Sequence, residues 1–180
     1  MQIYFKNYLE KLSKSLIEFN EDDFKKIANL ILNVKKNNKK VILVGNGGSA
    51  AIASHVSIDL TKVCKVRAIN FNEATLLTCF ANDYGYENWV QKALAFYADK
   101  GDLIILISSS GKSKNIINGA LFAKKSKLNL VTLTGFNKKN KLKKIGNVNL
   151  WIESNNYNFI ENTHQIWLLS IVDYLAKSNF

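Results

Sequence analysis

Proline is absent from the sequence, and no stretch rich in glycine and serine separates one part of the chain from another. No internal repeat is visible either. A chain of 180 residues without such boundaries predicts one domain, because domains usually run about 100–200 residues. We expect this domain to combine N-terminal helices in residues 1–38 with an α/β core in residues 39–180.

Cysteine is scarce, and long hydrophobic runs are missing. Cys64 and Cys79 provide neither a disulfide framework nor a CxxC pair, so we expect two reduced, mostly buried thiols. The longest strongly apolar stretch, residues 103–107, is too short to span a membrane. The N-terminus lacks the continuous apolar segment of a signal peptide. These features predict a cytoplasmic protein with no membrane partner.

Arginine is almost absent, although the formal net charge is +11. Arg67 is the only arginine, so lysine supplies nearly all of the positive charge. Base readout and bidentate phosphate recognition favour arginine, and no groove-binding motif accompanies the lysines. We therefore expect a solvated lysine surface rather than a nucleic-acid partner. The charge should still draw small anionic molecules toward the protein.

Short apolar segments alternate with helical patterns from residue 40 onward. The patterns predict strands at residues 40–45, 66–71, 102–107, 128–133 and 148–152. They predict helices at residues 1–19, 49–60, 73–81, 86–98, 114–125, 139–145 and 159–177, and a further helix that begins after residue 20. Continuously apolar strands between helices are typical of a parallel sheet that is covered on both faces. We predict an α/β fold: a doubly wound, mostly parallel five-stranded sheet with an N-terminal helical extension.

The first of two loops rich in glycine and serine follows the strand at 40–45, at the sheet edge where such folds bind ligands. Residues 45–50 fit the pattern GxGxxA, but Asn70 stands where a dinucleotide site needs an acidic residue, so we expect no nucleotide cofactor. Gly47 and Gly48 would let the backbone approach an anion, with Asn46 and Ser49 as side-chain partners.

The second loop, residues 108–113, follows the strand at 102–107. It is not a Walker A loop, because Leu106 stands where that motif needs a glycine. One serine here would be explained by helix capping. Four serines suit a phosphate monoester better, because hydroxyl groups, free amides and a helix N-terminus converge; they are Ser108, Ser109, Ser110 and Ser113.

Both histidines of the chain have a carboxylate about one helical turn away. His55 and Asp59 lie four residues apart on one predicted helix, and Glu161 and His164 lie three apart on the last one. Each pair can be an ordinary helix-surface contact or a buried histidine with its partner. Each can also hold zinc or a similar divalent ion, or supply acid and base for proton transfer.

In combination, these motifs resemble those of the phosphoheptose isomerases, a family within the sugar isomerase (SIS) domain superfamily. The resemblance covers nearly the whole chain and is carried by residues 45–50, His55 and residues 81–86, 108–113 and 133–135. It implies a cytoplasmic homotetramer with active sites at subunit contacts. It also implies conversion of sedoheptulose 7-phosphate to D-glycero-D-manno-heptose 7-phosphate, for surface polysaccharide synthesis.

The resemblance also assigns roles to individual residues. The substrate contacts of the family fall on Asn46, Gly47, Gly48, Asn82, Asp83, Ser108, Ser109, Ser110 and Ser113. One zinc ion per subunit would be held by His55, Asp59 and Glu161, where Asp59 replaces the family glutamate and Glu161 the family glutamine. The second catalytic histidine of the family falls on Leu169, and His164 matches a further histidine of many members.

These departures from the family pattern leave three readings. In the first, Asp59 or Glu161 removes a proton next to the carbonyl group, and His164 protonates or shuttles to the oxygens through an enediolate. In the second, the same fold acts on another phosphosugar. In the third, the chain is a non-catalytic module that binds a phosphosugar or a protein. We predict the first, because acid–base candidates remain on two helices.

Overall fold

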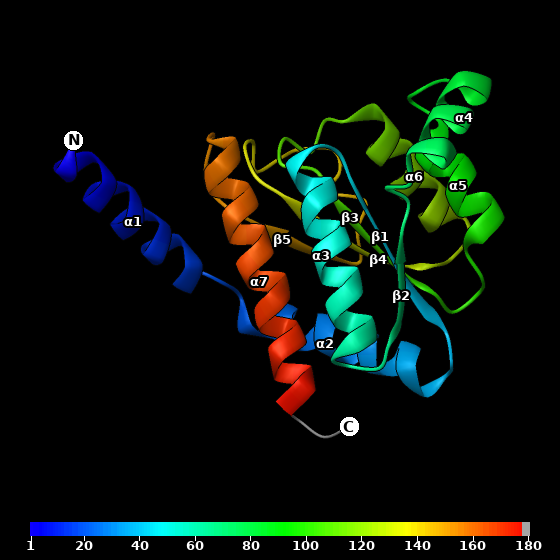
Figure 1. Ribbon diagram of the computed structural model, residues 1–180, viewed down its shortest axis with the longest axis horizontal. Helices are drawn as coiled ribbons and strands as arrows, with labels where there is room; N and C mark the ends of the chain where they lie inside the picture. Colours follow the sequence, from blue (N-terminus) through cyan, green and yellow to red (C-terminus); the bar gives the residue numbers. More distant parts are fainter. Residues whose placement is uncertain (178–180) are drawn as a thin grey trace.

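The computed structural model describes residues 1–177; residues 178–180, the end of the predicted core, lie outside the described part. The strands are β1 (Lys40–Gly45), β2 (Arg67–Asn70), β3 (Leu103–Ile107), β4 (Asn129–Thr134) and β5 (Val148–Trp151). The helices are α1 (Gln2–Ile17), α2 (Glu21–Lys36), α3 (Gly48–Lys62), α4 (Ala74–Tyr84), α5 (Trp89–Tyr97), α6 (Lys114–Lys125) and α7 (Tyr157–Lys177). Figure 1 shows the helices on both sides of the central sheet.

The strands of residues 1–177 form one sheet in the order β2-β1-β3-β4-β5, and every pairing is parallel. The predicted doubly wound fold is confirmed. The strand order reverses between β1 and β3, and the last residues of these two strands, Gly45 and Ile107, are register partners. The loops that follow them therefore leave the sheet side by side, at the position where open α/β sheets bind ligands.

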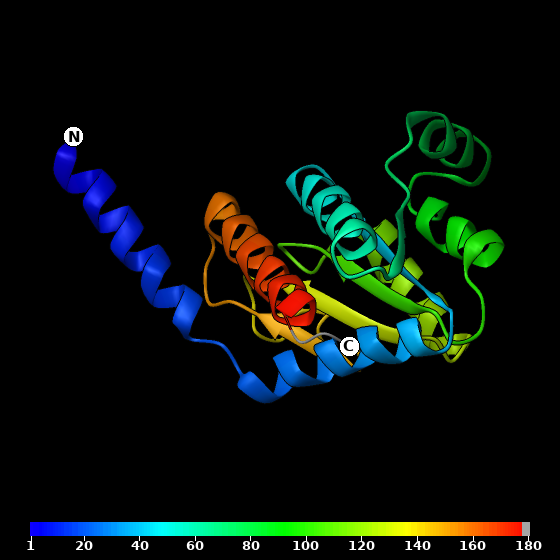
Figure 2. The same cartoon turned by 60° about the horizontal axis from the view of Figure 1, so that its bottom comes forward.

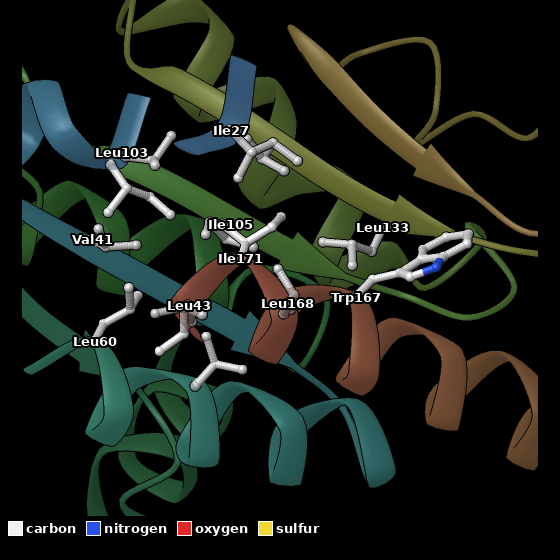
Figure 3. Close-up of a cluster of buried hydrophobic side chains, with 14 of the residues drawn as sticks. Ile27, Val41, Leu43, Leu60, Leu103, Ile105, Leu133, Trp167, Leu168 and Ile171 are labelled. Carbon is white, nitrogen blue, oxygen red and sulfur yellow. The ribbon is translucent and has the colours of Figure 1, made fainter. Parts of the chain in front are cut away.

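Two layers of apolar side chains fix the sheet between the helices. Successive residues of a strand point to opposite faces, so Val41 and Leu43 pack toward α2, α3 and α7, while Ile42 and Val44 pack toward α5 and α6. Figure 3 shows the first of these clusters, in which Trp167 and Leu168 of α7 lie against the sheet. This packing holds α3 and α7 next to each other on one face (Figures 1 and 2).

Helix α1 projects away from the rest of the molecule (Figure 2). None of its residues is buried, and Ile3, Phe5 and Leu9 expose more than half of their surface. Its contacts with α7 include a hydrogen bond that Trp167 Nε1 donates to the carbonyl oxygen of Leu16, at 3.1 Å. None of the helices described in residues 1–177 has the length and hydropathy of a membrane span.

Two sequence expectations are wrong. The segment 139–145 is a series of turns rather than a helix, because its backbone bonds join residues three apart and the side chain of Leu142 is drawn into the core. Cys79 is exposed, while Cys64 is buried as expected. Cys79 lies on α4, a peripheral helix with no buried residue in the described chain.

Candidate active site

The first loop contains a glycine with a positive φ angle, and a pair of asparagines joins the loop to α6 by hydrogen bonds. Gly47 has a φ angle of +54°, a conformation that side chains disfavour, and α3 begins directly after it. Asn46 and the buried Asn115 exchange two hydrogen bonds, at 3.0 and 2.8 Å, and Tyr86 donates to Asn46 Oδ1 at 3.4 Å. Neither Asn115 nor Tyr86 was predicted as a site residue, since nothing local marks contacts across 69 and 40 residues.

The serine loop turns directly into the N-terminus of α6. Ser108 Oγ donates to Ser113 Oγ at 3.1 Å, and the amide of Lys112 donates to Ser110 Oγ at 3.3 Å. Ser113 occupies the N-cap position of α6, yet within the described chain its side chain makes no capping hydrogen bond. Helix capping therefore does not account for Ser113. The hydroxyl hydrogens of Ser110 and Ser113 are donated to no described residue and are available to an anion at this helix end, whereas the buried Ser108 and Ser109 donate to Ser113 and Glu161.

Glu161, in the second turn of α7, joins the two loops. Ser109 Oγ donates to Glu161 Oε1 at 3.3 Å. The carboxylate also lies against the Cα atom of Gly48, where an added Cβ would overlap it. Glu161 therefore belongs to the same sheet edge as the serine loop, and both of its oxygens are in contact with neighbouring residues.

A second polar group lies along the seam between α3 and α7. His55 Nε2 is 3.3 Å from Asp59 Oδ2, and Gln165 Nε2 is 3.3 Å from His55 Nδ1. The side chains of His55 and Asp59 are 49% and 31% exposed, so the pair can be reached from solvent. The i,i+4 spacing predicted the His55–Asp59 contact, but the contact of Gln165 with His55 was not predicted.

His164 is fully buried and faces β4 rather than the seam. Its Nε2 lies 3.2 Å from the carbonyl oxygen of Thr134, and Nδ1 has no partner in residues 1–177. Burial lowers the pKa of His164 to about 4, although the hydrogen bond to Thr134 opposes the change. A neutral side chain without exposed surface cannot donate a proton directly to a substrate, so this geometry does not support the expected acid role.

Asn82 and Asp83 lie apart from both loops in the hydrogen-bond network. Both are exposed on α4, where Asn82 Nδ2 donates to Asp83 Oδ1 at 2.9 Å. No hydrogen bond of the described residues connects either of them to the first loop or to the serine loop. In the described residues, the segment that contains Asn82 and Asp83 is joined to the first loop through Tyr86, which follows α4 and donates a hydrogen bond to Asn46.

The residues expected to hold zinc do not form a ligand set. Both ring nitrogens of His55 already have partners, whereas a metal ion needs one of them free. Glu161 is in contact with Ser109 and Gly48 instead of joining His55 and Asp59. Among residues 1–177, no group of three or more histidine, cysteine, aspartate or glutamate side chains could hold a metal ion. The donor set therefore does not fit zinc, and we derive no step through a metal.

Comparisons with known proteins agree with this architecture. The sequence model of the SIS domain family matches residues 4–135. A phosphoheptose isomerase of Sulfurimonas denitrificans is 33% identical, in an alignment that covers 100% of this chain and 97% of that relative. One from Buchnera aphidicola is also 33% identical and covers 81% of this chain and 79% of its own length.

A solved structure shows the same fold. The phosphoheptose isomerase GmhA from Neisseria gonorrhoeae superposes with a TM-score of 0.88, over 97% of this chain and 96% of that one. Its sequence is 24% identical to this chain, so the superposition shows only that the two share a fold. The fold thus agrees with the family that the sequence comparisons indicate.

Proposed function

The chain belongs to the phosphoheptose isomerases of the SIS domain family, and we propose that it converts sedoheptulose 7-phosphate to D-glycero-D-manno-heptose 7-phosphate. The observation that carries the proposal is the arrangement of a serine loop at a helix N-terminus, next to a seam that contains carboxylates. Such a reaction needs an anion site for the phosphate and a base for the sugar. It moves hydrogen within one substrate and therefore requires no nucleotide cofactor.

The serine loop is the proposed phosphate site. The hydroxyl groups of Ser108, Ser110 and Ser113 surround the start of α6, whose free amides and dipole favour an anion. The first loop, with Asn46 fixed by Asn115, is the proposed site for sugar hydroxyl groups. Both loops leave paired strand ends, so one molecule can contact both.

Asp59 is the proposed base. One oxygen of this carboxylate faces His55, and the other makes no hydrogen bond in residues 1–177, so it is free to accept a proton. Glu161, the alternative base, has both oxygens against neighbouring groups and is better suited to hold the loops and the sugar hydroxyls. Asp59 lies 11 residues after Gly48, about three turns along α3, on the face of that helix that meets α7.

The proposed reaction begins when Asp59 takes a proton from carbon 1 of the ketose, and an enediolate forms. Asp59 returns this proton to carbon 2, while a second proton passes from the oxygen of carbon 1 to that of carbon 2. Solvent water can carry this second proton, because both ring nitrogens of His55 are already in contact with Asp59 and Gln165 and His164 is buried; His55 instead orients Asp59.

Self-association is part of the proposal. Helix α1 presents apolar side chains that the described chain does not cover, among them Ile3, Phe5 and Leu9. We expect this helix to lie in the contacts of a homotetramer, and the enzyme to act in the cytoplasm on sugars destined for surface polysaccharide. Light scattering should give four chains for the wild type and a smaller assembly for Phe5→Ser/Leu9→Ser.

Product formation tests the proposed function. Purified protein is incubated with sedoheptulose 7-phosphate, and the anomeric proton signal of the aldose is followed with a chelator and, in parallel, with added zinc. We expect aldose in both samples, in amounts that Asp59→Asn reduces strongly. Product in neither sample contradicts the proposal, and product only with zinc contradicts the metal-free assignment.

One observation favours a second candidate, a non-catalytic phosphosugar-binding protein. Leu169 occupies the position of the second catalytic histidine that the resemblance to the family implies. This candidate predicts calorimetric binding of the sugar phosphate without any aldose signal. Binding together with turnover excludes it.

A further inference from the structure

The seam between α3 and α7 contains three polar side chains in a row, and the reaction described above uses only two of them. Gln165 Nε2 is 3.3 Å from His55 Nδ1, and His55 Nε2 is 3.3 Å from Asp59 Oδ2. The row therefore runs from an amide on α7, through an imidazole, to a carboxylate on α3. In such a row, His55 can orient the base Asp59, and Gln165 can in turn hold His55.

The chemistry of the three groups favours one tautomer of His55. An ionised carboxylate only accepts hydrogen bonds, so a proton on Nε2, the nitrogen 3.3 Å from Asp59 Oδ2, suits this contact. In the neutral ring the other nitrogen, Nδ1, then has a lone pair, and the amide N–H of Gln165 donates to it. Without such a donor the exposed ring could turn or exchange tautomers, and its contact with Asp59 would be lost for part of the time.

The position of Gln165 follows from the way the two helices pack. Glu161 and Gln165 lie four residues apart and share one face of α7. Glu161 rests on Gly48, whose missing side chain lets the two helices approach at that end. One turn later, Gln165 is half-buried and reaches His55 across the same seam.

We propose that Gln165 is a positioning residue that holds His55 in the tautomer whose Nε2–H faces Asp59. As a step in the reaction this rests on the proposed function, but the contact itself can be tested without a substrate. The chain has two histidines, so ring ¹⁵N labelling gives few signals, and His55→Gln identifies those of His55. The variants are Gln165→Leu and Gln165→Met, which lack the donor, and Gln165→Glu, which replaces it with an acceptor.

Long-range ¹H–¹⁵N spectra at neutral pH should show Nε2 of His55 protonated and Nδ1 accepting a hydrogen bond. In Gln165→Leu and Gln165→Met, the Nδ1 signal should move toward that of an unbonded imidazole nitrogen. In Gln165→Glu, both nitrogens should carry protons, because the ring then lies between two carboxylates. Unchanged His55 signals in all three variants would overturn the proposal.

Kinetics tests the positioning role. We expect Gln165→Leu to lower kcat about tenfold, because even a small displacement of a catalytic group slows the reaction. KM should stay close to the wild-type value, because Gln165 touches neither loop. Gln91→Leu makes the same change on α5 and is the matched control, with kcat unchanged. Equal kcat values in the two variants would overturn the positioning role. If the wild type gives no product, the proposed function fails, and the ¹⁵N spectra still decide whether Gln165 orients His55.

Discussion

The carboxylate of Glu161 lies over the Cα atom of Gly48, in the space that a β-carbon at residue 48 would fill. This contact joins the start of α3 to α7, and the hydrogen bond from Ser109 to Glu161 extends it to the serine loop. Gly48 is therefore needed for close approach of two helices. Glu161 thus contacts one residue of each loop, Gly48 and Ser109, so a change there should affect binding as well as stability.

Gly48→Ala should displace the Glu161 carboxylate and break its bond with Ser109. We expect a loss of about 1–3 kcal/mol in the free energy of unfolding, as is typical of overpacking, and weaker binding of the sugar phosphate. Urea denaturation and calorimetry measure the two effects. In a Glu161→Ala background the same change should cost much less, since the space is then vacant. An equal loss of stability in both backgrounds would show that a side chain at residue 48 and the carboxylate of Glu161 do not compete for the same space.

Asp59→Asn and Glu161→Gln separate the two candidate bases. Asp59→Asn should lower kcat about 10²–10⁴-fold, the usual contribution of a positioned acid–base group. Glu161→Gln keeps an oxygen that can accept from Ser109, so kcat should fall far less. Steady-state kinetics on both variants decides between them, and a larger loss in Glu161→Gln would transfer the role of base to Glu161.

Ser110→Ala should weaken binding of the sugar phosphate more than it harms folding. A hydrogen bond to a charged group contributes about 1.5–3 kcal/mol, which corresponds to a loss of roughly tenfold or more in affinity. Ser126→Ala, at the opposite end of α6, is the matched control and should bind normally. Calorimetry compares the three proteins. Equal affinities for Ser110→Ala and the wild type would count against the serine loop as the phosphate site.

Stability should depend on pH through His164. Burial lowers its pKa from 6.5 to about 4, so the unfolded chain binds a proton that the folded chain rejects between these two values. The contribution of neutral His164 is complete above pH 6.5 and is lost as the pH falls toward 4. Between pH 6.5 and pH 5 the free energy of unfolding should fall by about 1.5 kcal/mol more in the wild type than in His164→Gln. Equal slopes in urea denaturation would contradict this.

Asp102 should matter for stability and not for turnover. It is fully buried before β3, and it accepts from the backbone amide of Lys40 at 3.0 Å while the Lys40 ammonium lies 2.7 Å away. Asp102→Ala would leave that ammonium with only the exposed Asp99 and should cost about 3–5 kcal/mol. Because the pair lies at the opposite edge of the sheet from the loops, kcat per folded molecule should be unchanged.

Local patterns were sufficient for most of the fold. The apolar run of β1 and the spacing of His55 and Asp59 depend on neighbours in sequence, and both were predicted correctly. The contact between Gln165 and His55 was not predictable, because it joins residues 110 positions apart through the packing of two helices. The burial of His164 is one of the alternatives that the sequence left open, and it has a local signal: Ile160 and Leu168, one turn before and after it, are core residues.

The most direct test of the account is solvent deuterium incorporation during turnover. The wild type in deuterated water should place deuterium on carbon 1 of the remaining ketose and carbon 2 of the aldose, with a chelator present. Asp59→Asn should give almost none, while Glu161→Gln should still give both signals. Absence of exchange in the wild type, or undiminished exchange in Asp59→Asn, would contradict proton transfer by Asp59 in the α3–α7 seam.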